Sequence, residues 1–168
     1  MNNKKETIAI VPGSFDPITY GHIDIVKRAL QLYDKVFLAV MINPNKEYMF
    51  TIEERVNIAK AALIDLEKVK VISSEGMLWQ LAKDMSASAI VKGYRNNVDL
   101  EYEKKMEVFN SEHYPPAKTV LLKADNTMEN ISSTFVRERI IKGQCLDGLL
   151  PETAITEIKR IVNSKYTK

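Results

Sequence analysis

The sequence predicts an α/β fold: a Rossmann-like, doubly wound sheet of five parallel strands with helices on both faces. Two observations support this class. Short apolar, β-rich runs alternate along the chain with amphipathic helical patterns. The links between them are short, which favours parallel strands joined by crossover helices. No linker, repeat or low-complexity segment divides the 168 residues, so we expect a single domain over residues 1–168.

Five apolar runs are expected as strands. Pro12 and Gly13 are expected to stop the first run. The second run is continuously apolar, which is typical of a strand buried on both faces. The runs are 8–11, 36–42, 69–72, 89–91 and 120–122.

Helical patterns follow these runs. Thr51 and Glu54 have the spacing of a capping box, which marks the start of a helix. Pro151 opens the last helix, in which Ile155, Ile158 and Val162 recur at helical spacing. Helical stretches are expected near 19–33, 51–63, 77–85, 98–112, 134–143 and 151–162.

Composition excludes several classes of protein. Hydrophobic residues make up 45% and charged residues 27%, an ordinary balance for a globular protein and unlike that of a disordered chain. The 24 Lys and Arg against 22 Asp and Glu leave a net charge of +2, so we expect no nucleic-acid partner. No run approaches eighteen apolar residues, so no membrane span is expected. The single cysteine, Cys145, excludes an internal disulfide and fits a cytoplasmic location.

The loops after the strands hold the unusual chemistry. In an open parallel sheet, ligands bind beyond the carboxyl ends of the strands. Four of the five loops there contain glycines, cations or hydroxyls that suit a phosphate, while the loop 73–76 has little beyond Glu75. The four are 12–18, 43–48, 92–97 and 123–134.

The first loop and the helix after it form a candidate phosphate site. Gly13 lets backbone N–H groups approach a ligand, and Ser14 adds a hydroxyl. Gly21 and His22 fall in the first helical turn, where free N–H groups and the helix dipole favour a phosphate. The same dipole disfavours imidazolium, so we expect a neutral His22 that donates one ring N–H. A tight turn with a capping histidine is the alternative, and the Rossmann and P-loop glycine patterns are absent.

Cations stand in two further loops. Lys46 follows the second strand, and Lys92 and Arg95 flank Gly93. Arginine can make bidentate hydrogen bonds to phosphate oxygens, while lysine acts as a point charge. A solvated lysine and a surface cluster on an ordinary turn are the alternatives. Glu103, on the next helix, either faces solvent or accepts hydrogen bonds from a ribose or adenine.

The fifth loop ends in hydroxyls at a helix start. Ser132 or Ser133 is expected as the N-cap, and the spare N–H groups there can also bind an anion. No Ser–His–acid or Cys–His nucleophile set stands out, and His22 and His113 form no metal pair. We expect no protein metal site; Mg²⁺ would be carried with ATP on its phosphates, since no carboxylate cluster offers a cage.

Residues 12–22 read Pro-Gly-Ser-Phe-Asp-Pro-Ile-Thr-Tyr-Gly-His and resemble the signature of the nucleotidyltransferases with an H/T-x-G-H motif. More narrowly, the chain resembles the bacterial phosphopantetheine adenylyltransferase family over about residues 6–162. The supporting stretches are 43–46 before 49–55, then 92–95 with 99–103, and 131–134. Any one stretch is unspecific, but their order and spacing together are specific.

The resemblance implies transfer of the adenylyl group of Mg-ATP to 4′-phosphopantetheine, which gives dephospho-CoA and pyrophosphate in coenzyme A biosynthesis. It also implies a homohexamer and feedback binding of CoA. The residues implied on the acceptor side are Ser14, Lys46, Leu78 and Lys92. Those implied on the ATP side are Ser14, Phe15, His22, Gly93, Tyr94, Arg95, Glu103, Met128, Glu129, Asn130, Ile131, Ser132, Ser133 and Thr134.

Three positions depart from the family pattern. Ser14 stands where threonine is usual and keeps the hydroxyl. Thr134 replaces the last serine of a triple-serine run. Lys92 stands where arginine is usual, so the charge remains but forked phosphate contact is lost.

A phosphate monoester acceptor needs no general base. Its second pKa is near 6, so its attacking oxygen is largely deprotonated at neutral pH. Catalysis then rests on holding the two molecules in line, with donors and positive charge where the α-phosphoryl group gains charge, and no covalent intermediate forms. We expect catalytic roles for His22 as the donor, for Lys46 beside it, and for Arg95, which steadies the pyrophosphate with the helix start at 132–134.

Three alternatives stay open. A sibling transferase would use another acceptor, such as nicotinate mononucleotide or glycerol 3-phosphate. A class I aminoacyl-tRNA synthetase-like module would need a second lysine–serine loop and an anticodon-binding region, and the sequence has neither. A non-catalytic nucleotide-binding domain would bind ATP without releasing pyrophosphate.

Overall fold

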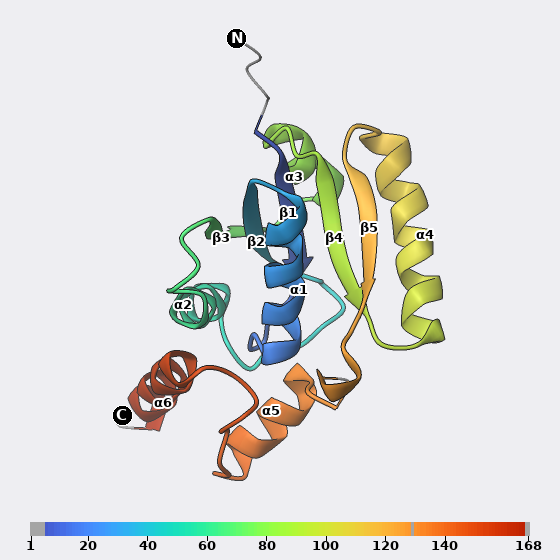
Figure 1. Ribbon diagram of the computed structural model, residues 1–168. Helices are drawn as coiled ribbons and strands as arrows, with labels where there is room; N and C mark the ends of the chain where they lie inside the picture. The colour runs from blue at the N-terminus through green and yellow to red at the C-terminus, as the bar shows by residue number, and fades with distance from the viewer. Residues whose placement is uncertain (1–5, 129, 167–168) are drawn as a thin grey trace.

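The computed structural model describes residues 6–128 and 130–166. Its centre is a five-stranded parallel sheet in the order β3-β2-β1-β4-β5 (Figure 1). The chain builds outward from β1 to β3 and then returns to β4 on the other side of β1, so the order reverses between β1 and β4. The strands are β1 (Ile8–Gly13), β2 (Lys35–Met41), β3 (Val69–Ser74), β4 (Ala89–Tyr94) and β5 (Lys118–Lys123). The predicted class, a doubly wound parallel sheet, is confirmed.

Helices cover both faces of this sheet. Successive side chains of a strand point to opposite faces, so Ala9 and Val11 of β1 pack in one core cluster and Ile10 packs in the other. The first cluster receives side chains from α1, α2, α5 and α6, and the second receives them from α3. The helices are α1 (Tyr20–Leu32), α2 (Ile52–Ala62), α3 (Leu78–Asp84), α4 (Asn97–His113), α5 (Ser133–Ile141) and α6 (Glu152–Tyr166), with a short 3₁₀ turn at Asn126–Met128.

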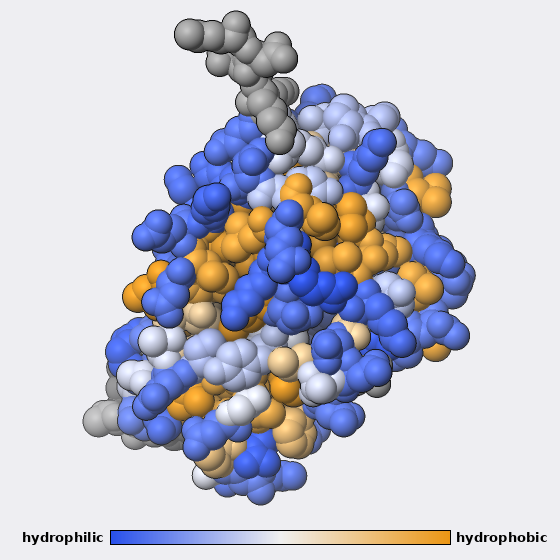
Figure 2. Space-filling view, in the orientation of Figure 1, coloured by the Kyte–Doolittle hydropathy of each residue, from blue (hydrophilic) through white to orange (hydrophobic). Residues whose placement is uncertain are grey.

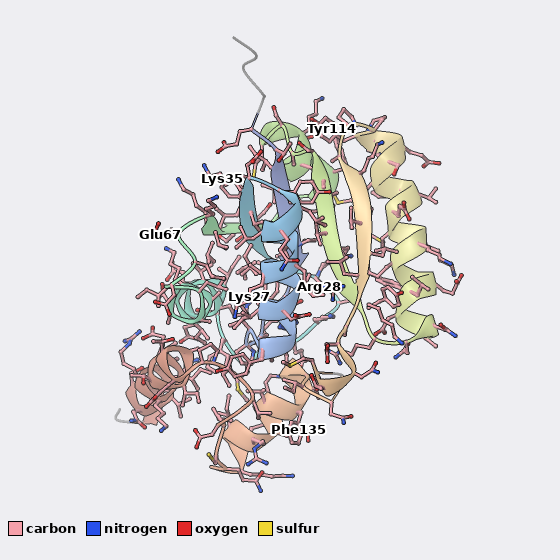
Figure 3. The ribbon with its side chains drawn as sticks, in the orientation of Figure 1. Lys27, Arg28, Lys35, Glu67, Tyr114 and Phe135 are labelled. Carbon is pink, nitrogen blue, oxygen red and sulfur yellow. The ribbon has the colours of Figure 1, made fainter. Side chains whose placement is uncertain are left out.

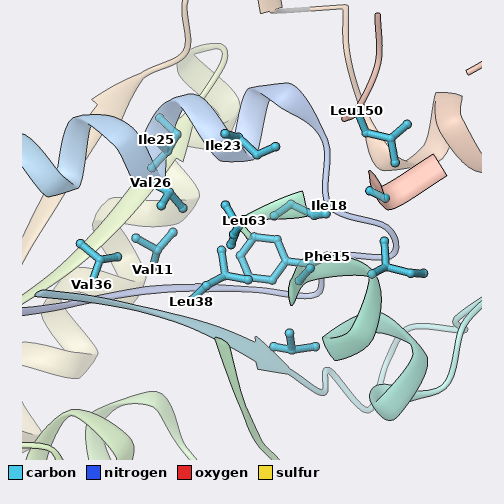
Figure 4. Packing of buried hydrophobic residues seen from close by; sticks show 14 of the residues in the cluster. Val11, Phe15, Ile18, Ile23, Ile25, Val26, Val36, Leu38, Leu63 and Leu150 are labelled. Carbon is cyan, nitrogen blue, oxygen red and sulfur yellow. The ribbon is translucent and has the colours of Figure 1, made fainter. Parts of the chain in front are cut away.

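The loop after β1 is fixed by its own apolar side chains. Phe15 and Ile18 are buried in the first core cluster, which also contains Leu38 and Leu150 (Figure 4). Burying one such side chain stabilises the fold by roughly 1.5–3 kcal/mol relative to leaving it exposed. Two of them in so short a loop therefore strongly favour a single loop conformation. Ser14, between β1 and Phe15, is therefore held by the core.

The last helix packs against its own chain. Ile155, Ile158 and Ile161 of α6 are buried in the first core cluster, where Val162 packs against them, as the helical spacing predicted. Among the helices and strands, α2 is the main partner of α6. An ion pair of 2.8 Å between Lys165 Nζ and Glu54 Oε2 joins the two helices at their ends.

Four strands continue further into the following loops than predicted. β3 runs through Ser73 and Ser74, which pair with β2, and β5 includes Lys123, which pairs with Tyr94. β1 continues through Pro12 and Gly13, because both still pair with β2, opposite Ala39 and Val40. β4 continues through residues 92–94, which pair with β5 and were expected in a loop.

β1 and β4 separate toward their carboxyl ends. They pair only at Ala9 and Ile10, whereas β1 pairs with β2 along its whole length. This separation falls where the strand order reverses, which is the position at which open α/β sheets bind ligands.

The face bearing α1 is mainly hydrophilic, with apolar groups between the polar ones (Figure 2). Arg28 of α1 donates to the carbonyl of Lys123 at 2.8 Å, and so ties α1 to the end of β5 (Figure 3). Within residues 6–128 and 130–166, no helix has the length and apolar content to cross a membrane.

Candidate active site

Two adjoining cavities open at the carboxyl edge of the sheet. Their volumes are about 580 and 450 Å³. The first lies between the ends of β1 and β4, and the second lies between the loop after β1 and the start of α5. Phe15, His22, Lys46 and Arg95 line both cavities. The structure therefore brings together side chains that the sequence spreads over three loops.

The remaining predicted residues divide between the two cavities. The first is lined by Lys92, Gly93, Tyr94, Glu103, Met128 and Ile131. The second is lined by Ser14, Ser132, Ser133 and Thr134.

Two of the predicted residues that the structure describes line neither cavity. Leu78, at the start of α3, lines neither cavity and packs against the second core cluster. Asn130 also lines neither cavity. Glu129 lies outside the described residues.

His22 is held by the residue that precedes its helix. The backbone N–H of Thr19 donates to Nδ1 of His22 at 3.0 Å, and the Thr19 hydroxyl lies 3.1 Å from the same nitrogen. Because Nδ1 accepts, the proton of the neutral ring is on Nε2. Burial, and to a smaller extent the positive charge of Arg95, together lower the pKa of His22 from its ordinary value near 6.5 to about 4. His22 is thus a neutral Nε2–H donor at neutral pH.

Phe15 supports the imidazole from the side. Its ring meets His22 edge-on, with centroids 5.0 Å apart and an interplanar angle of 84°. Its backbone has φ of 47°, in the left-handed region. A Cβ on Gly13 would lie 2.8 Å from the tip of the Phe15 ring. Glycine at position 13 therefore makes room for Phe15, a reason that the sequence alone did not indicate.

Lys92 and Glu103 form an ion pair across the first cavity. Their side chains are only 17% and 15% exposed, so the pair is largely shielded from water. Arg95 and Lys46 are exposed, and among the described residues no carboxylate forms an ion pair with either of them.

The start of α5 is docked onto the loop after β1. Ser132 is the N-cap and accepts from the backbone N–H of Phe135 at 3.0 Å. The hydroxyl of Ser133 donates to the carbonyl of Pro17 at 2.8 Å. Ser132 thus fills the capping role, and Ser133 fixes the helix relative to the β1 loop.

Arg55 was missed by the sequence analysis as a support of the site. It is 1% exposed, and its Nη1 donates to the carbonyls of Ser14 and Met41 at 2.7 and 3.1 Å. Its guanidinium lies 4.0 Å from the centroid of the Tyr48 ring. The available signal was a charge on the apolar face of the helix that Thr51 caps.

Arg137 was missed as well. It lines the second cavity, and its Nη1 donates to the carbonyl of Asp16 at 2.8 Å. Asp16 is buried and accepts from the backbone N–H groups of Met49 and Phe50 at 2.9 and 3.0 Å. An arginine inside a helix gives no sequence signal for such a position.

The fold and the cavities at the sheet edge define a nucleotidyltransferase-like protein. The sequence model of the family described as cytidylyltransferase-like matches residues 10–139. That stretch includes most of β1, all of β2 to β5 and α1, and nearly all of α5, and therefore both cavities.

Relatives extend the similarity to the rest of the chain. The chain is 38% identical over 160 residues to the phosphopantetheine adenylyltransferase of Streptococcus uberis, covering 95% of this chain and 96% of that protein. It is 42% identical over 145 residues to the protein of that name from Caldanaerobacter subterraneus subsp. tengcongensis, covering 86% and 91%. For the one from Clostridium kluyveri the identity is 39% over 158 residues, covering 94% and 96%. The chain belongs to the cytidylyltransferase-like family and, within it, to the branch that holds these phosphopantetheine adenylyltransferases.

Proposed function

We propose that the chain transfers the adenylyl group of ATP to 4′-phosphopantetheine and releases dephospho-CoA and pyrophosphate. The names of its relatives support the two substrates. The observation on which the mechanism rests is the fixed, neutral His22, a donor that faces both cavities.

In this proposal His22 donates from Nε2 to a nonbridging oxygen of the ATP α-phosphate. The α-phosphoryl group gains negative charge in the transition state, and a donor already aimed at it needs no reorganisation. A neutral donor also keeps its proton, since nothing in the reaction requires His22 to act as an acid. Lys46 and Arg95, which line the same cavities, add positive charge on either side.

The acceptor phosphate attacks in line, without a covalent intermediate. At neutral pH this monoester is largely a dianion, so no general base has to remove a proton. Lys92 and Lys46 bind its oxygens, and Ser14 donates its hydroxyl. Lys92 exchanges its contact with Glu103 for one with the phosphate, and Glu103 becomes available to the adenosine part of ATP.

Mg²⁺ enters this proposal as part of Mg-ATP, on which it shields the phosphate oxygens. Three of the carboxylates that line the cavities are already engaged. Asp99 accepts from the backbone N–H of Arg95 at 3.3 Å, Glu103 pairs with Lys92, and Asp16 accepts from two backbone N–H groups. Among the described residues, no group of three or more His, Cys, Asp or Glu could hold a metal ion.

An acceptor screen tests the function. The purified chain is given ATP or CTP together with 4′-phosphopantetheine, nicotinate mononucleotide or glycerol 3-phosphate, and pyrophosphate release is followed. We expect release only with ATP and 4′-phosphopantetheine. Release with another pair would favour a sibling transferase, and ATP binding without any release would favour a non-catalytic nucleotide-binding domain.

The homohexamer, the feedback binding of CoA and the cytoplasmic location also belong to the proposal. Exposed apolar side chains on α4, with Val98 79% and Val108 58% exposed, support self-association. Light scattering after size exclusion measures the number of subunits, and CoA added to the acceptor assay measures the feedback.

A further inference from the structure

Tyr48 closes the loop that carries Lys46. Its Oη accepts from the backbone N–H of Asn43 at 2.7 Å and donates to the carbonyl of the same residue at 3.3 Å. That carbonyl also accepts from the backbone N–H of Lys46 at 3.0 Å. The side-chain oxygen of Asn43 accepts from the backbone N–H of Asn45 at 2.9 Å. The hydroxyl of Tyr48 thus holds the end of the loop 43–48 against its start, and the turn that contains Lys46 lies between them.

The ring of Tyr48 joins this loop to the loop after β1. It packs on the guanidinium of Arg55, whose central carbon lies 4.0 Å from the ring centroid. Arg55 is buried and donates to the carbonyls of Ser14 and Met41. Met41 is the last residue of β2, from which the loop 43–48 departs. Tyr48 therefore contacts the loop that it closes through its hydroxyl, and the residue that holds Ser14 through its ring.

Lys46 relies on its loop for its position. The side chain is exposed and lines both cavities, and within residues 6–128 and 130–166 no carboxylate forms an ion pair with it. The place of its ammonium group in the cavities therefore depends on the backbone of the loop. A loop that is already ordered loses less conformational entropy when a ligand binds, which strengthens binding.

Neither the sequence motifs nor the proposed mechanism assigns a task to Tyr48. The stretches that carry the family resemblance are 43–46 and 49–55, and residue 48 falls between them. We propose that Tyr48 is a positioning residue that holds Lys46 where it meets the acceptor phosphate, an inference that rests on the proposed function. Tyr48 acts through Lys46, since its own hydroxyl is engaged with Asn43. Without that hydroxyl, the loop samples conformations in which the ammonium group is displaced from the phosphate.

A double-mutant cycle tests this assignment. Tyr48→Phe removes the hydroxyl and keeps the ring on Arg55, and Lys46→Ala removes the group to be positioned. The kcat/KM for 4′-phosphopantetheine is measured for the wild type, both single variants and the double variant. Tyr33→Phe is the matched control, because Tyr33 is a half-buried tyrosine at the C-cap of α1 and lines neither cavity.

We expect Tyr48→Phe to lower kcat/KM for 4′-phosphopantetheine by about threefold to tenfold, the loss typical of one or two neutral hydrogen bonds. The KM for ATP should stay unchanged, and Tyr33→Phe should match the wild type. When Tyr48→Phe is added to Lys46→Ala, we expect no further loss, because the lysine that Tyr48 positions is absent.

Other roles for Tyr48 give different results. If Tyr48 only stabilises the fold, Tyr48→Phe lowers the Tm and leaves kcat/KM unchanged. If Tyr48 acts on the substrate independently of Lys46, the two losses multiply in the double variant. Either result overturns the assignment, and so does an equal rise in the KM for both substrates.

Hydrogen exchange gives a measurement that does not depend on the reaction. The backbone amides of Asn43, Asn45 and Lys46 should exchange faster in Tyr48→Phe than in the wild type, because the loop opens more often. Unchanged exchange overturns the assignment. Should Tyr48→Phe fail to fold, Asn43→Ala takes its place in the cycle with the same expected results, because it removes the acceptor of the Asn45 N–H in the same loop.

Failure of this inference is distinguishable from failure of the proposed function. If the wild type does not release pyrophosphate in the acceptor screen, the function is wrong, and hydrogen exchange still decides whether Tyr48 orders the loop. If the wild type is active and Tyr48→Phe has the same kcat/KM, only this inference is wrong.

Discussion

The backbone N–H of Thr19 donates to Nδ1 of His22, so the residue at the N-cap of α1 sets the direction in which the imidazole donates. The bond spans three positions in sequence and needs no distant partner. The neutral ring therefore donates its hydrogen bond from Nε2.

Replacing His22 by alanine should lower kcat by about 10²–10³ and leave ATP binding largely intact, as for loss of one donor to a developing negative charge. Steady-state kinetics together with calorimetric ATP binding make this measurement. His113→Ala is the control, because His113 is exposed, stacks on Trp79 and lines neither cavity. A near-normal kcat for His22→Ala would remove His22 from the mechanism.

The low pKa of His22, about 4, predicts that stability falls with acid. Between about pH 6.5 and pH 4 the unfolded chain takes up a proton on this histidine and the folded chain does not. The free energy of unfolding then decreases as the pH falls, by at most about 1.4 kcal/mol per pH unit from this group, and above pH 6.5 the contribution is constant. Urea unfolding at about pH 7 and pH 5 measures this. The free energy of unfolding should fall more between the two pH values for the wild type than for His22→Gln. Equal dependence in the two proteins would contradict the shift.

Lys46→Ala should raise the KM for the acceptor about tenfold, because the acceptor phosphate loses its contact with an ammonium group that lines both cavities. Lys27→Ala is the matched control, since Lys27 is an exposed lysine of α1 outside both cavities (Figure 3). Initial-rate kinetics at varied acceptor concentration measure both. Unchanged kinetics for Lys46→Ala would make Lys46 an ordinary solvated residue.

Glu103→Gln should destabilise the fold by about 1–3 kcal/mol, because it leaves the shielded ammonium of Lys92 without its partner. The control is Glu101→Gln, which breaks the exposed pair of 3.1 Å between Lys104 and Glu101 on the same helix. That change should cost about 0.5 kcal/mol or less. Chemical denaturation compares the two. Equal losses would indicate that the Lys92–Glu103 pair is as well solvated as the control pair.

Arg55→Lys should lower the free energy of unfolding by about 1–3 kcal/mol, because one ammonium cannot reproduce both carbonyl contacts and the stacking on Tyr48. Arg160→Lys is the control, with an arginine side chain that is 64% exposed and pairs with Glu157. Thermal unfolding measures both. If the two lysine variants melt alike, the buried contacts of Arg55 contribute little.

The sheet and the rim of the site were predictable because they depend on local patterns. Continuous apolar runs such as residues 36–40 mark strands buried on both faces, and the parallel order brings their carboxyl ends to one edge. His22, Lys46 and Arg95 lie in or just after loops at these strand ends, so their position near that edge could be predicted.

The parts that were not predictable depend on contacts distant in sequence. Arg55 reaches Ser14 across 41 positions, and Arg137 reaches Asp16 across 121. The extension of β1 through Pro12 depends on pairing with β2, which no local rule for proline captures. The packing of Leu78 in the second core cluster likewise depends on the position of α3 under the sheet.

The docking of α6 on α2 has a practical consequence for anyone engineering this chain. Arg55 of α2 donates to the carbonyl of Ser14. A substitution that weakens the packing of Ile158 or Ile161 therefore affects the loop that contains Phe15, although neither residue belongs to that loop. Variants that lack α6 would lose this support of α2. A lower kcat in such variants would therefore not indicate that residues of α6 take part in the chemistry.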